Sequence, residues 1–137
     1  MNAEVMSPAV AGAPRILLRL EGLIVLAAAA LAFAEFDGPG ALGMSWWLAA
    51  VVFFAPDLSF AAYLAGPRVG SIAYNAAHSY IAPLVLGAFA FHALGRASFA
   101  LALLWIAHIG FDRALGYGLK YATGFSDTHL GRIGKPR

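Results

Sequence analysis

The sequence predicts an all-α fold, an integral membrane protein whose four helices form an up-down bundle with both termini in the cytoplasm. Two observations lead to this prediction. The 137 residues are 61% hydrophobic and only 12% charged, which departs from the balance of soluble domains. The apolar residues also fall into runs of about twenty residues, the length that an α-helix needs to cross a bilayer.

Both ends of the chain are expected to lie outside the bundle. Residues 1–14 are rich in small residues and Pro and have no basic n-region, so we expect a disordered lead-in rather than a cleaved signal peptide. The four-helix transmembrane domain is assigned to residues 15–121, and a cytoplasmic C-terminal segment to residues 122–137. Neither tail is long enough to bury a core of its own.

Turn residues separate the four expected spans. Residues 37–40 (DGPG) end the first span, and Trp46 and Trp47 mark the membrane interface at which the second begins. Pro56 predicts a kink or local unwinding in this second span, because proline cannot donate a backbone hydrogen bond. Short turns at residues 66–68 (GPR) and 95–96 (GR) imply antiparallel neighbours. The spans are expected at about residues 16–36, 45–65, 69–94 and 97–118.

Basic residues predict the orientation of the bundle. Lys and Arg collect in cytoplasmic loops, and with four crossings only Arg96 falls on the outer side. The net charge of +2 is too small to suggest nucleic acid as a partner. Arg19 and Lys120 are expected to extend their charged ends to the membrane surface. The basic residues on the cytoplasmic side are Arg15, Arg19, Arg68, Lys120, Arg132, Lys135 and Arg137.

Polar residues of all four spans are expected at one depth, in the cytoplasmic half of the membrane, counting about 1.5 Å of rise per residue. Asn75, His78 and Ser79 are spaced by three and four residues, and His108 and Asp112 by four, so each of these two groups lies on one helix face. A charge at the bilayer centre costs about 2.5–3.5 kcal/mol, so these side chains must be paired, hydrated or bound to something. The polar set comprises Glu21, Asp57, Asn75, His78, Ser79, His108 and Asp112.

Imidazole and carboxylate groups are suitable ligands for Zn²⁺, Mn²⁺ or Fe²⁺. The chain has no Cys, which excludes disulfides, iron–sulfur clusters and thiolate ligands. The expected metal ligands are Asp57, His78, His108 and Asp112. Glu21 and Asp57 are the candidate catalytic carboxylates, and Glu21 or an unliganded carboxylate would serve as general base. Supporting roles are expected for Asn75, Ser79 and Arg113, and for Asp127 and His129 on a loop that folds back over the polar layer.

Other interpretations of the same residues stay open. The polar layer could be a structural network in which Arg113 neutralises a carboxylate, and Glu21 could form a salt bridge near the interface. A structural or interaction protein would use the layer to fix helix register. A small proton or ion transporter, or channel-like module, would bind the ion with these groups, and a homodimer would be needed to complete the path.

Four motifs carry a resemblance to a known family. Residues 74–79 (YNAAHS), 108–113 (HIGFDR), 116–121 (GYGLKY) and 127–131 (DTHLG) resemble the small bacterial membrane family catalogued as domain of unknown function 4260. The resemblance extends from Arg19 to Gly134. It implies a multi-pass protein of the bacterial inner membrane and assigns no activity.

The chain is also distantly similar to the LexA-regulated inner-membrane metal-dependent hydrolases. Pro56-Asp57, His78-Ser79 and the His108/Asp112 pair match motifs of that family, whereas Tyr74-Asn75 stands where the family has His-Arg. This similarity implies a metal-dependent hydrolase. Because the site would open toward the cytoplasmic leaflet, the leading hypothesis is hydrolysis of a lipid or lipid-linked substrate, with the bilayer and that substrate as partners.

Overall fold

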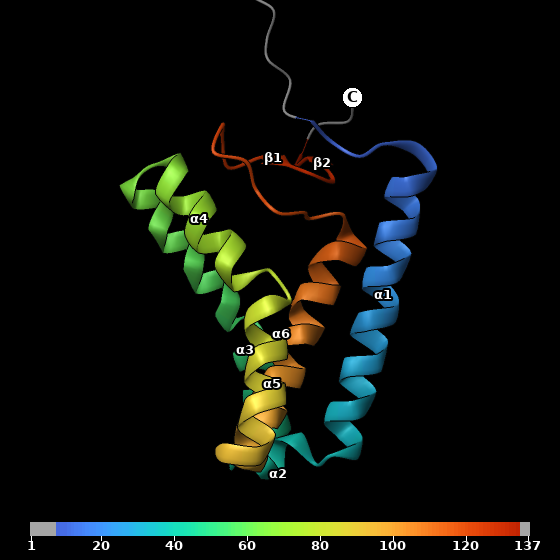
Figure 1. Ribbon diagram of the computed structural model, residues 1–137, viewed down its shortest axis with the longest axis vertical. Helices are drawn as coiled ribbons and strands as arrows, with labels where there is room; N and C mark the ends of the chain where they lie inside the picture. Colours follow the sequence, from blue (N-terminus) through green and yellow to red (C-terminus); the bar gives the residue numbers. More distant parts are fainter. Residues whose placement is uncertain (1–7, 135–137) are drawn as a thin grey trace, which may run out of the picture.

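Helices α1 (Gly12–Glu35) and α6 (Arg96–Leu115) lie side by side over most of their length and form the longest helix pair of the molecule (Figure 1). Glycines allow this close approach. A Cβ atom built on Gly110 of α6 would lie 2.7 Å from the backbone nitrogen of Leu26 and 2.8 Å from the carbonyl oxygen of Gly22. The two helices therefore pack backbone against backbone.

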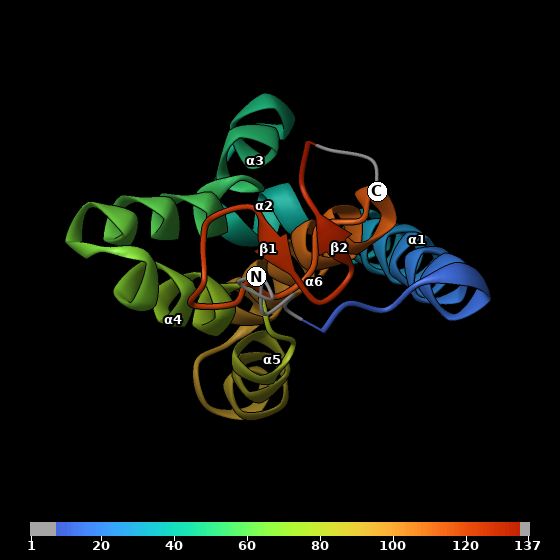
Figure 2. The ribbon, with the colours of Figure 1, turned by 90° about the horizontal axis from the view of Figure 1, so that it is seen from above.

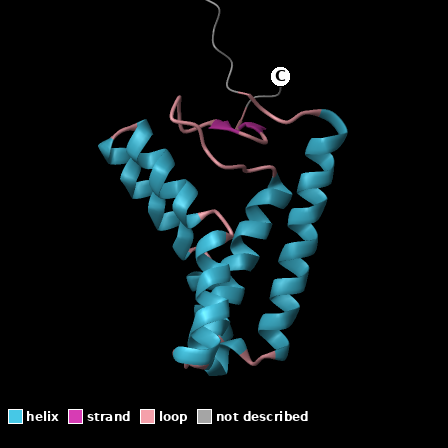
Figure 3. Cartoon of the chain, in the orientation of Figure 1, coloured by secondary structure: helices cyan, strands magenta, loops and turns pink. Residues whose placement is uncertain are grey.

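The computed structural model describes residues 8–134. Between α1 and α6 the chain is divided into shorter helices, and after α6 it ends in a small hairpin. Helices account for nearly all the regular structure, so the predicted all-α class fits (Figure 3). The shorter elements are α2 (Gly38–Leu42), α3 (Trp46–Val52), the 3₁₀ helix η1 (Ala55–Ala65), α4 (Pro67–Ala77), α5 (Ile81–Ala93), β1 (Asp127–Thr128) and β2 (Gly131–Arg132).

The second and third apolar runs are both interrupted. The second changes from α3 to η1 just before Pro56, where the sequence predicted a kink. The third, expected as one helix, is divided into α4 and α5 by residues 78–80. Pro83 contributes to this break, because a continuous helix would need a hydrogen bond from residue 83 to the carbonyl of Ser79, which proline cannot donate; in the first turn of α5 the proline is tolerated. Both breaks lie opposite α6.

The segment after α6 folds back over the helices. Gly116, with φ of +92°, ends α6 in the left-handed conformation, and the strands β1 and β2 form an antiparallel pair above the helix ends (Figure 2). The side chain of Asn75 on α4 bonds the backbone of Lys120 in both directions, at 2.7 and 2.9 Å. The C-terminal segment is therefore joined to α4 as well as to α6.

The expected lead-in, residues 1–14, lies outside the described residues as far as Ser7. From Pro8 onward the chain is placed: α1 begins at Gly12, and the backbone N–H of Val10 donates to the carbonyl of His129 at 2.8 Å. The start of α1 and the C-terminal hairpin consequently lie at the same end of the molecule.

Three helical segments are long and apolar enough to cross a membrane, namely Gly12–Glu35, Trp46–Ala65 and Arg96–Leu115. Many large apolar side chains face outward, and Leu64 on η1 is 95% exposed. Large exposed apolar surfaces mark contact with lipid or with a partner. Neither α4 nor α5 reaches the length of a span by itself, because the break at residues 78–80 divides that run.

Candidate metal centre

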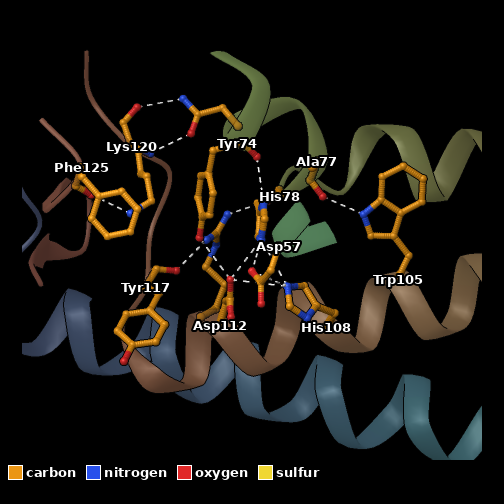
Figure 4. Close-up of polar contacts among 12 residues, drawn as sticks. Asp57, Tyr74, Ala77, His78, Trp105, His108, Asp112, Tyr117, Lys120 and Phe125 are labelled. Carbon is orange, nitrogen blue, oxygen red and sulfur yellow. Dashed lines mark hydrogen bonds and ion pairs between the residues drawn. The ribbon is translucent and has the colours of Figure 1, made fainter. Parts of the chain in front are cut away.

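Four side chains from three parts of the chain meet beside α6 (Figure 4). One ligand atom from each of Asp57, His78, His108 and Asp112 lies within 4.8 Å of all the others. His78 Nε2 is 3.2 Å from His108 Nε2, 3.3 Å from Asp57 Oδ1 and 3.4 Å from Asp112 Oδ2. His108 Nε2 is 3.5 and 3.8 Å from the same two carboxylate oxygens.

The two helix breaks place the ligands from the second and third runs. Asp57 lies in the first turn of η1, directly after Pro56, and His78 is the residue at which α4 ends. His108 and Asp112 stand one turn apart on α6, so they share a face of that helix. A proline near each break thus directs a polar side chain toward α6.

The hydrogen bond of His78 determines which of its ring nitrogens has a free lone pair. Nδ1 lies 2.9 Å from the carbonyl oxygen of Tyr74, which can only accept, so Nδ1 carries the hydrogen. In the neutral ring, the lone pair of Nε2 then faces two carboxylate oxygens and the other imidazole. Protons can bridge only some of these pairs, whereas one divalent cation at the centre would satisfy all four atoms.

The separations fit a small metal ion. Zinc binds His nitrogen and carboxylate oxygen at about 2.0–2.2 Å, so ligand atoms around a tetrahedral ion stand about 3.3–3.6 Å apart. The five separations given above range from 3.2 to 3.8 Å. Two imidazoles and two carboxylates also form a donor set that Mn²⁺ and Fe²⁺ accept.

Surrounding groups orient the four ligands. The hydroxyl of Tyr74 donates to Asp112 Oδ2 at 3.1 Å, and its ring stacks on His78 with centroids 3.7 Å apart. The rings of Phe53 and Phe54 flank His108 at 5.2 and 6.1 Å. His78 and His108 are fully buried, while the Asp57 side chain is about one third exposed. His108 Nδ1 is buried with no hydrogen-bond partner among the described residues.

Side chains of α6 also satisfy carbonyls near the end of α4. Trp105 Nε1 donates to the carbonyl of Ala77 at 2.6 Å, and the Arg113 guanidinium donates to that of His78 at 2.8 Å and to that of Tyr117 at 2.7 Å. The last carbonyls of a helix have no intrahelical N–H donor, and the side chains of Trp105 and Arg113 supply donors to the carbonyls of Ala77 and His78 instead. Arg113 therefore supports the site by fixing the backbone around His78.

Several predicted site residues lie outside the cluster. Glu21 is exposed on α1 and is not among the grouped ligands, so the structure does not bring this expected general base to the site. Asn75 instead holds the backbone of Lys120. Ser79 lies in the break beside His78 and is half-buried. The structure thus groups four of the expected residues as ligands and places Arg113 and Ser79 next to His78, whereas Glu21 and Asn75 lie outside the cluster.

Asp127 and His129 shape the C-terminal segment. Asp127 accepts a hydrogen bond from Thr123 Oγ1 at 2.9 Å, and His129 Nδ1 accepts one from the backbone N–H of Leu119 at 2.8 Å. Burial lowers the pKa of His129, so its ring is neutral at pH 7, as this acceptor role requires. The two residues hold the fold of the loop rather than joining the four ligands.

Lys120 occupies a different position from the one expected. Its side chain does not reach the surface: the residue is 4% exposed, and Nζ donates to the carbonyl of Phe125 at 2.6 Å. Nζ also lies 3.8 Å from the ring centroid of Phe125 and 4.8 Å from that of Tyr74. The prediction that Lys120 extends to the membrane surface is wrong, because the C-terminal segment folds inward and encloses the ammonium group.

A cleft of about 350 Å³ opens beside the cluster. Asp57 and Asp112 line it from the cluster, and Tyr117, Lys120 and Phe125 line it from the C-terminal segment. The remaining walls are mainly aromatic, with Phe54, Phe60, Tyr74 and Phe111. The partly exposed carboxylate of Asp57 gives this cleft direct access to the candidate metal centre.

Sequence reasoning missed Tyr74 and Lys120 as parts of the site. Both belong to motifs singled out in the sequence, but no spacing rule indicates that a tyrosine hydroxyl reaches Asp112 or that a lysine turns inward. Comparison with curated proteins and with solved structures found no match to this chain. A family model does match residues 15–133, and the chain belongs to that family, described as Domain of unknown function (DUF4260).

Proposed function

We propose that this protein is a metal-dependent hydrolase of the bacterial inner membrane, acting on a lipid or a lipid-linked substrate. The observation that carries the proposal is the convergence of four lone-pair-bearing atoms from Asp57, His78, His108 and Asp112. Without a metal, the nitrogen and oxygen atoms of these four side chains face one another at 3.2 to 3.8 Å, and protons can bridge only some of the pairs. A divalent ion at their centre would satisfy all four lone pairs.

If a fifth position on the side of the cleft stays open, a divalent ion held by these four ligands would lower the pKa of a water molecule bound there and so supply a nucleophile near pH 7. The surrounding residues have separate tasks. Asp57, the most exposed of the four, can accept a proton from water that enters the cleft. Tyr74 holds Asp112 in place, and Phe53 and Phe54 exclude water from the side of His108.

The position of the cleft supports a substrate that comes from the membrane. Its walls are mainly aromatic, and the cleft lies between the helices and the folded C-terminal segment. The outer surfaces of the flanking segments are apolar, as Leu58 (78% exposed) and Leu64 of η1 illustrate. An amphipathic molecule could therefore place its polar end near Asp57 while its apolar part stays among the helices.

Metal content tests the proposal. We expect purified wild-type protein to carry about one equivalent of Zn, Mn or Fe by elemental analysis, and His78→Ala and His108→Ala to lose at least ten-fold in metal affinity. His92→Ala is the matched control, because His92 is exposed near the end of α5. Equal, negligible metal in wild type and His108→Ala would overturn the proposal.

A further inference from the structure

We propose that the cleft beside the metal centre recognises a phosphate ester, and that Lys120 is the residue that determines this specificity. The inference rests on the proposed metal centre and specifies the class of substrate that the centre acts on.

Lys120 places an ammonium group in the same cleft as two ligand carboxylates. Nζ has three N–H donors, and one is used by the carbonyl of Phe125. Within the described part of the chain, no carboxylate lies within ion-pair distance of Nζ. Its other contacts are the faces of Phe125, Tyr74 and Phe60, which attract a cation without neutralising its charge.

Without a metal, the charges in and next to the cleft cancel. Asp57 and Asp112 supply two negative charges to its lining, Lys120 supplies one positive charge to it, and Arg113 supplies another from beside Asp112 on α6, outside the lining. A bound divalent ion then leaves an excess of two positive charges in a poorly hydrated region, where excess charge is expensive. A phosphate monoester carries about −1.5 to −2 at pH 7 and would restore the balance, whereas a neutral ester would not.

The two basic residues differ in what they can offer to such an anion. Arg113 directs its two terminal nitrogens at backbone carbonyls, so it contributes charge but is held in place. Lys120 retains unused donors and lines the cleft. Burial lowers the pKa of Lys120 to about 8, and Asp112 and Asp57 partly oppose this effect. At pH 7 the side chain is therefore still mostly charged.

Phosphate binding to the full-length protein in detergent tests the inference. With metal loaded at pH 7, calorimetric titration of inorganic phosphate should give saturable binding that disappears when the metal is removed. Lys120→Met should weaken binding at least ten-fold with unchanged metal content, while Lys120→Arg retains most of it. Arg68→Met removes a charge from an exposed position and should bind like wild type.

A second titration uses short-chain phosphatidate in the same micelles. Tighter binding than inorganic phosphate would assign a lipid headgroup as the source of the phosphate, and equal affinity would assign a soluble one. Failure of both ligands to bind the metal-loaded wild type, or undiminished binding by Lys120→Met, would overturn the inference and leave the metal centre intact. If no metal binds, both proposals fail. If Lys120→Met does not fold, the comparison of metal-loaded with metal-free wild type still tests whether the metal-loaded cleft binds phosphate.

Discussion

Tyr74 contacts the candidate metal centre through its carbonyl, its hydroxyl and its ring. Its carbonyl accepts from His78 Nδ1, its hydroxyl donates to Asp112, and its ring lies between His78 and Lys120. Groups that hold metal ligands in this way commonly contribute 10–100-fold to metal affinity. The hydroxyl can be removed without changing the other two contacts.

Tyr74→Phe should therefore lower metal affinity by about 10–100-fold while the protein stays folded, because the ring stacking and the backbone contact remain. Competition with a metal chelator measures the change. Tyr63→Phe is the control, since the Tyr63 hydroxyl is buried without a hydrogen-bond partner among the described residues. Equal affinities in the two variants would show that the Tyr74 hydroxyl does not support the site.

At this scale the sequence predicted which polar residues meet but not all of their neighbours. Depth counting and helical spacing placed Asp57, His78, His108 and Asp112 in one layer, and they do lie together. Glu21 matched in depth, but depth does not say which face of α1 a residue occupies, and its side chain is exposed. The inward turn of Lys120 depends on the loop after Gly116, which has no periodicity to interpret.

Among the elements, the pair α1 and α6 is the scaffold that carries the two ligands of α6. The contact depends on small residues: a Cβ on Gly22 would lie 2.5 Å from the Cβ of Arg113, and one on Gly110 would meet the backbone of α1. Backbone atoms cannot move aside as a flexible side chain can. Any side chain at Gly110 must therefore push the helices apart.

Gly110→Ala should destabilise the protein by about 1–3 kcal/mol, although alanine favours helix more than glycine does. Unfolding in increasing denaturing detergent, followed by circular dichroism, gives the change. Gly87→Ala on α5 is the matched control, because its Cβ would sit 3.4 Å from that of Ala102, close to ordinary contact. The close α1–α6 packing would be contradicted if Gly110→Ala were as stable as the Gly87 variant.

The helix breaks could be predicted only in part. Pro56 indicated the first break, because the proline lies at the position where the helix changes character. Pro83 gave weaker guidance, since a proline within the first turn of a helix is tolerated and the break at residues 78–80 precedes it. The bonds from Trp105 and Arg113 that stabilise this break come from α6, about thirty residues away in sequence.

For the whole molecule, membrane orientation remains a prediction. Ala97 lies at the start of α6, and Ala122 lies in the C-terminal segment that follows the end of α6. Both residues are exposed. The chain has no Cys, so single cysteines can report which side of the membrane each end faces. The distribution of Lys and Arg places the Ala122 end in the cytoplasm.

In intact cells, Ala97→Cys should react with a membrane-impermeant maleimide, and Ala122→Cys should react only after the membrane is permeabilised. The cysteine-free wild type is the background control. Labelling of Ala122→Cys in intact cells would reverse the proposed orientation, and labelling of both would contradict a transmembrane arrangement of α6.

X-ray absorption at the metal edge of the purified protein tests the four-ligand metal centre most directly. We predict a first shell of nitrogen and oxygen at about 2.0–2.2 Å with outer-shell scattering from two imidazoles. His108→Ala, if it retains metal at high concentration, should show one imidazole. A spectrum without imidazole scattering, or one identical in wild type and His108→Ala, would contradict the assignment of Asp57, His78, His108 and Asp112 as ligands.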